Sequence, residues 1–140
     1  MIDLEFKIVA GKNNKIPKGD IILNNKTIHS GVYNFSTKTV KPKIGQNFLE
    51  ITLTNKDPNK DTILENGKIV DDVYIVLENI RCQSTGDTLK NKFNVIGKMC
   101  TNDHNELKTN GYISFNGSYK INFGYPFFVW ENTKDLKLII

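Results

Sequence analysis

The chain has 140 residues, the length of one ordinary domain, and 39% of them are apolar and 24% charged, as in proteins that fold around a single core. No apolar run approaches the roughly 20 residues that span a bilayer, so we expect no membrane insertion. The formal charge is +4, but the 18 lysines are scattered and Arg81 is the sole arginine. This pattern argues against specific nucleic-acid recognition.

Short alternating segments separated by Asn, Gly, Asp and Lys clusters run along the chain, which is typical of β-structure. In one of them Leu49, Ile51 and Leu53 alternate with polar residues and predict a half-buried strand. Asn24 and Asn25 can both take the positive φ of a turn between two strands. The first strand candidates in chain order are residues 4–10, 19–28, 31–40 and 45–55.

The segment 71–80 is apolar on both faces, with Ile75 and Leu77 on one and Val76 and Ile80 on the other. It predicts a central strand that is covered on both sides. Two Asn-Gly pairs separate flanking strand candidates, and both central positions of a type I′ turn require positive φ. We therefore expect tight hairpins at residues 66–67 and 116–117.

The most irregular part of the sequence is residues 85–111, where we expect a long loop. Phe127 and Trp130 stand at helical spacing, so one helical turn is expected there before a last strand at residues 136–140. Residues 1–140 thus predict an all-β fold: a single-domain antiparallel β-sandwich, jelly-roll-like, with at most one short helical turn near the C-terminus.

The densest acidic group surrounds the first Asn-Gly pair. Asp57, Asp61, Asp71 and Asp72 converge if residues 61–72 fold back as a hairpin. Carboxylate oxygens at about 2.4 Å are what calcium prefers, but acids beside lysines are also typical of a solvated turn. The sequence leaves both readings open: a calcium site, or residues that border a hairpin at one end of the sandwich.

Aromatic residues are densest at residues 125–130. Tyr125 and Trp130 are candidate platforms for stacking sugar rings, and the alternative is that the group belongs to the core or to an interface.

No nucleophile motif or phosphate-binding loop appears, so we expect a protein that is not an enzyme. Cys82 and Cys100 lack a CxxC spacing and are expected to be free thiols, and the alternative is a single disulfide in an oxidising compartment.

Two stretches carry a resemblance to a known family. The run from Asn55-Lys56 through Asp61-Thr62 and Gly67 to Val70, ending in an apolar strand after Asp72, resembles a small β-sandwich domain of structural proteins in tailed-bacteriophage tails, necks and fibres. The closing segment, residues 116–132, is similar to the end of that domain. The resemblance implies a virion location, contacts with other virion proteins, a homo-oligomer and, at the surface, a host glycan.

The same layout is more loosely similar to calcium-dependent xylan-binding modules of glycan-degrading enzymes. That resemblance implies an alternative function, calcium-dependent carbohydrate binding, in which the loop with Asp57 and Asp61 supplies ligands.

Overall fold

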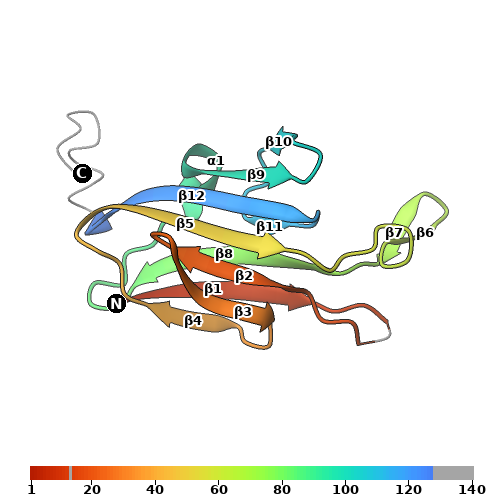
Figure 1. Cartoon of the computed structure of the whole chain (residues 1–140), viewed down its shortest axis with the longest axis horizontal. Coiled ribbons are helices and arrows are strands. Elements are labelled where there is room, and N and C mark those ends of the chain that lie inside the picture. Colours follow the sequence, from red (N-terminus) through yellow and green to blue (C-terminus); the bar gives the residue numbers. More distant parts are fainter. Residues whose placement is uncertain (13, 128–140) are drawn as a thin grey trace.

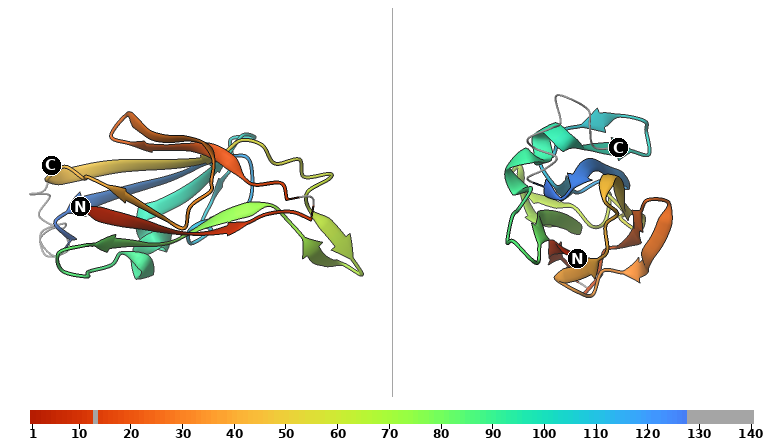
Figure 2. Two further views of the ribbon diagram at one scale, coloured as in Figure 1. Left: turned by 90° about the horizontal axis from the view of Figure 1, so that it is seen from below. Right: turned by 90° about the vertical axis from the view of Figure 1, so that its left-hand side faces the viewer.

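The strands of the chain form two antiparallel sheets that face each other, as Figure 1 shows for this computed structural model. The structure describes residues 1–12 and 14–127. A separate two-stranded hairpin extends beyond one end of the sandwich (Figure 2). The predicted all-β sandwich is therefore confirmed.

The smaller sheet has the strand order β11-β8-β1-β4 and the larger one β10-β9-β12-β5-β2-β3. The smaller sheet comprises β1 (Ile2–Val9), β4 (Thr37–Val40), β8 (Tyr74–Cys82) and β11 (Tyr112–Ile113). The larger sheet comprises β2 (Lys18–Leu23), β3 (Lys26–Val32), β5 (Gly45–Leu53), β9 (Gly97–Thr101), β10 (Glu106–Leu107) and β12 (Gly117–Tyr125). The projecting hairpin comprises β6 (Ile63–Glu65) and β7 (Lys68–Asp71).

The core lies between the two sheets and is built from alternating side chains. Leu49, Ile51 and Leu53 of β5 are buried as predicted, and β12 pairs with β5 along its whole length. Tyr119 and Phe123 of β12 point into the same space and are fully buried. Burial of apolar area on this scale is the main favourable contribution to folding.

Strand β8 lies between β11 and β1, as predicted for a central strand, but its outer face is only partly covered. Ile75 and Leu77 face the core, whereas on the opposite face Val76 is buried and Glu78 is exposed. A bulge at Glu78 shifts the register with β1. Because a bulge adds one residue to one strand only, Ile80 returns to the core face, and its predicted position on the outer face is wrong.

Two of the predicted turns are confirmed. Asn24 and Asn25 have φ values of 51° and 66°, and they join β2 to β3. Asn66 and Gly67 have φ values of 53° and 77°, and they join β6 to β7. Positive φ at both central residues is the signature of a type I′ turn, whose twist matches that of the flanking strands.

The hairpin predicted at Asn116-Gly117 is wrong. Strand β11 pairs with β8 in the smaller sheet, whereas β12 belongs to the larger one, so the chain crosses between sheets at this point. Gly117 has φ of 148°, and a Cβ there would lie 2.2 Å from the carbonyl oxygen of Cys100. Close backbone approach, which requires glycine, explains this residue better than a tight turn does.

The long loop expected at residues 85–111 is also wrong in part. It contains the 3-10 helix η1 (Lys90–Lys92), the short helix α1 (Phe93–Ile96), β9 and β10. Phe93 is 1% exposed and anchors the helix in the core. The expected C-terminal helical turn at Phe127 to Trp130 and the expected strand at residues 136–140 lie wholly or mostly outside the described residues. Within the described ranges no helix has the length and apolarity needed to cross a membrane.

Candidate functional site

The predicted fold-back of residues 61–72 is present and forms the projecting hairpin. At its base the Lys15 ammonium lies 2.6 Å from a carboxylate oxygen of Asp61, and the backbone N–H of Asp57 donates to the same oxygen. Burial favours the neutral acid, but the hydrogen bonds and the charge of Lys15 outweigh it, so the pKa of Asp61 lies below its usual value. The stabilisation is therefore present at neutral pH and is lost as the pH falls through that lowered pKa.

A second ion pair lies deeper, between Lys56 and Asp72. The Lys56 ammonium is 2.7 Å from Asp72 and donates to the carbonyl oxygen of Ser114 at 2.6 Å. Only 6% of the Lys56 side chain and 13% of the Asp72 side chain are exposed. Asp72 also accepts hydrogen bonds from the Thr62 hydroxyl and the backbone N–H of Val73. This pair ties the hairpin base to the strand crossing beside Ser114.

The hairpin therefore brings the predicted metal residues to one end of the sandwich, but lysines lie among them. Asp61 and Asp71 line one small depression of about 200 Å³ together with Lys12, Lys15 and Lys60. Asp71 accepts a hydrogen bond from the backbone N–H of Lys12. More positive than negative side chains at one site oppose cation binding.

The remaining aspartate of the predicted calcium set also has a local partner. Asp57 accepts a hydrogen bond from the backbone N–H of Asn59, as an Asx turn does. Among residues 1–12 and 14–127, no group of three or more His, Cys, Asp or Glu side chains has a metal-binding arrangement. The contacts thus favour the reading in which these acids border the hairpin.

The hairpin exposes apolar side chains at the far end of the molecule. Leu64 and Ile69 pair across its two strands and are 61% and 60% exposed, and Val70 is 44% exposed. An apolar cross-strand pair at that exposure marks a contact surface when the side chains are contiguous. The sequence analysis predicted the turn but not this exposed surface. The signal in the sequence was the pair of adjacent apolar residues between Lys68 and Asp71, in a strand too short to have two buried faces.

The predicted glycan platform is only partly described. Tyr125 is half-buried and packs against the core, with its ring 5.8 Å from that of Phe127. Its hydroxyl lies 3.9 Å from the Cys82 sulfur. Trp130 lies outside the described residues. Tyr125 therefore belongs to the packing at the end of β12, and stacking of sugar on this segment stays a prediction.

Cys82 and Cys100 are free thiols in the structure, and Cys82 has an unusual environment. Burial alone raises the pKa of the Cys82 thiol, but hydrogen bonds from Ser84, Thr85 and Tyr125 lower it from 9.0 to about 7. The reciprocal contact raises the pKa of Tyr125.

This lowered pKa predicts a pH dependence of stability. The folded state favours the Cys82 thiolate, so its contribution is fully present above pH 9.0 and is lost as the pH falls through about 7. The free energy of unfolding of the native chain, relative to Cys82→Ala, should thus rise between those two pH values. Urea unfolding at a series of pH values measures the difference, and parallel curves for the two proteins would contradict the lowered pKa.

A groove of about 550 Å³ lies beside the hairpin base and was not anticipated. Its lining includes Asn102, Asp103, Asn105 and Glu106, together with Phe115, which is 51% exposed. Polar side chains next to an exposed ring are a combination suited to sugars. The sequence signal was available in the polar run from Thr101 to Glu106. Its spatial neighbour Phe115 directly precedes the Asn116-Gly117 pair, where a hairpin turn was wrongly predicted.

Comparison of the chain with models of known protein families, with curated proteins and with solved structures finds no match.

Proposed function

We propose that this protein is a non-enzymatic structural subunit of a bacteriophage virion, and that it contacts a neighbouring copy of its own chain through the β6–β7 hairpin. The virion location rests on the sequence resemblance. The contact rests on one observation, the projecting hairpin with its exposed apolar pair Leu64 and Ile69. A two-stranded hairpin without a covering layer is marginal in water, and a partner that covers this pair stabilises it.

The charge of the hairpin suits contact between identical chains. Residues 63–70 contain one acid, Glu65, and one lysine, Lys68, so their formal charges cancel. The whole chain carries +4, and two copies repel each other over most of their surface at low salt. The neutral apolar hairpin is a place where two copies can meet without that repulsion. A two-fold arrangement would use the same patch on both chains.

The two ion pairs at its base prepare the hairpin for this role. Lys15 binds Asp61 and Lys56 binds Asp72, so both strands of the hairpin are tied to the sandwich. A contact element that is already ordered loses less conformational entropy when it binds.

The test is the double substitution Leu64→Lys with Ile69→Lys. In a two-fold contact both chains carry each substitution. Each substitution removes an apolar side chain from the contact and adds a positive charge to it. We expect the dissociation constant for self-association to rise by at least about a hundredfold. Sedimentation velocity over a range of protein concentrations measures it.

Ile44→Lys with Val95→Lys is the matched control. Both residues are highly exposed, at 75% and 85%, and the charge change is the same. This control should associate like the native chain. A native chain that stays monomeric at every concentration, or equal weakening in both double variants, would refute the hairpin contact.

An alternative function is carbohydrate binding, favoured by the groove that contains Phe115 and Asn105. In this alternative the ligand is a neutral glycan held without calcium, because lysines lie among the aspartates expected to bind the ion. Binding of xylan oligosaccharides that is lost in Phe115→Ala and unchanged by a chelator would favour it over the structural role.

A further inference from the structure

An open groove of about 760 Å³ is lined by residues from the edges of both sheets and by Met1. Figure 1 marks the N-terminus at the end of the sandwich away from the hairpin. One wall comes from β3, the edge strand of the larger sheet, and the other from β4, the edge strand of the smaller sheet. Farther along this side the gap is filled by aromatic rings, with His29 4.8 Å from Phe35 and 5.3 Å from Tyr33. The groove is the part that these rings leave open.

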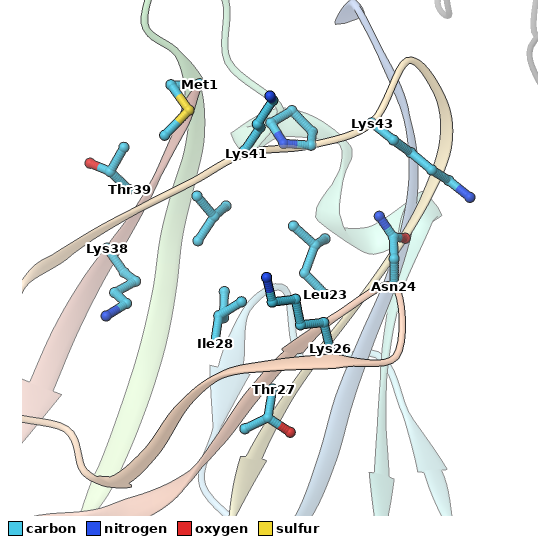
Figure 3. Close-up of a pocket in the computed structure, with 12 residues that line it drawn as sticks. Met1, Leu23, Asn24, Lys26, Thr27, Ile28, Lys38, Thr39, Lys41 and Lys43 are labelled. Atoms are coloured by element: carbon cyan, nitrogen blue, oxygen red, sulfur yellow. The ribbon is translucent and has the colours of Figure 1, made fainter.

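Four lysines line this groove. They are Lys26 on β3, Lys38 on β4, and Lys41 and Lys43 on the following loop, and no acid is among the described residues that line it. None of the four forms an ion pair with a carboxylate of the described residues. In Figure 3 the Lys26 side chain extends across the groove between Leu23 and Ile28, whereas Lys43 points away.

Nearby groups hold the Lys38 side chain and the Lys43 backbone in place without neutralising either charge. The Lys38 ammonium lies 5.5 Å from the centre of the Phe35 ring, a cation–π contact that keeps its charge. The backbone of Lys43 exchanges two hydrogen bonds with the buried amide of Asn47, which also accepts one from Asn24. The loop that forms one end of the groove is therefore fixed before any ligand arrives.

The remaining lining is mostly aliphatic, with Ile28 and Val40 on the two walls. Thr27 brings a hydroxyl group, whereas the hydroxyl of Thr39 donates a hydrogen bond to Asp3 at 2.7 Å. The part of the chain that the structure describes brings no aromatic ring to this lining. Proteins that bind single-stranded nucleic acids stack bases on aromatic rings or Arg, and this lining offers neither.

We propose that the groove binds an acidic glycan, a polysaccharide that carries carboxylate or sulfate groups. Its acidic groups pair with Lys26 and Lys38, its hydroxyl groups bond to Thr27, and the C–H faces of its rings lie on the aliphatic walls. Unpaired ammonium groups in one groove raise the local concentration of such a polyanion. The groove and the hairpin occupy different ends of the molecule, so this proposal does not depend on self-association.

The test uses dextran sulfate as the probe and uncharged dextran of equal length as its comparison. Calorimetric titration at about 0.15 M ionic strength limits long-range attraction to roughly 8 Å. We expect dextran sulfate to bind and uncharged dextran to bind far more weakly. Lys26→Gln with Lys38→Gln should weaken dextran sulfate binding at least about fivefold, from two ion pairs of ordinary surface strength.

Lys7→Gln with Lys108→Gln is the matched control. Both lysines are exposed and lie outside the groove, and the two substitutions remove the same total charge as Lys26→Gln with Lys38→Gln. The control should change the affinity less than about twofold, because neither lysine is among the residues that line the groove. Lys41→Gln replaces Lys38→Gln if that substitution prevents folding.

Equal losses in the two double variants would show attraction by net charge alone and would overturn the proposal. Tighter binding of single-stranded DNA or of polyglutamate, with the same dependence on Lys26, would assign the groove to a nucleic acid or an acidic peptide instead. Equal binding of charged and uncharged dextran would remove the role of the lysines.

Discussion

Replacement of Lys56 by Met is expected to lower the free energy of unfolding by about 3–5 kcal/mol, the cost of leaving a buried charge without its partner. Asp72 would lose its only ion pair among the described residues, and the Ser114 carbonyl would lose its donor. Met matches the length of Lys, so little packing is lost. Urea unfolding followed by circular dichroism measures the change.

A second substitution separates charge from packing. Asp72→Asn in the Lys56→Met background keeps an acceptor for Thr62 and for the Val73 N–H but removes the uncompensated charge. The double variant should therefore be more stable than Lys56→Met alone.

Lys15→Met provides the contrast. The Lys15 side chain is 34% exposed, against 6% for Lys56, so its ion pair is closer to the surface type, and its loss should cost about 1 kcal/mol or less. Equal costs at the two lysines would contradict the distinction between a buried and a superficial anchor.

The second large effect is expected at Asn47, whose fully buried amide makes four hydrogen bonds. It donates to the carbonyl oxygens of Lys43 and Gly45 and accepts from the Lys43 N–H and the Asn24 amide. Asn47→Ala leaves these groups without partners, and each buried unsatisfied group costs about 1–3 kcal/mol. Because water near the loop can hydrogen-bond to some of these groups, we expect the free energy of unfolding to fall by about 3 kcal/mol in total.

Asn55→Ala is the comparison for Asn47→Ala. Its amide also bridges two backbone groups, accepting from the Lys18 N–H and donating to the Ile16 carbonyl, but in exposed surroundings. Water replaces those bonds, so the cost should be about 1 kcal/mol. Hydrogen exchange should quicken at residues 41–45 in Asn47→Ala. Unchanged exchange there, with a loss no larger than in Asn55→Ala, would contradict the bridging role.

The strands were predictable where each side chain faces either the core or water. Leu49, Ile51 and Leu53 follow this rule, and the period of two fixes which face is buried. The bulge at Glu78 was not predictable, because one inserted residue changes the face of Ile80 without changing the composition of the strand.

The two Asn-Gly pairs show that a local turn signal does not by itself predict a hairpin. Asn66-Gly67 joins strands that pair with each other, whereas Asn116-Gly117 joins strands in different sheets. The difference lies in distant contacts: the Asn116 amide exchanges two hydrogen bonds with the backbone of Lys56, 60 residues away in sequence. Tertiary pairing of this kind overrides turn propensity.

The candidate sites also have a part that local sequence signals predicted and a part that depends on distant contacts. The fold-back that gathers the aspartates was predictable from the turn at Asn66. The identity of their partners was not, since Lys15 meets Asp61 across 46 residues. The groove lined by Lys26 and Lys38 could not be predicted from the sequence either. The two lysines lie on edge strands of different sheets, and no sequence period links two strands that do not pair.

The most direct measurement is the mass of the native chain in solution by light scattering, over a range of concentrations, with calcium and with a chelator. We expect an oligomer whose mass and melting temperature are the same in both conditions, because the hairpin supplies the contact and lysines bind the buried aspartates. A monomer whose melting temperature rises with calcium would contradict both the hairpin contact and the role assigned to the lysines.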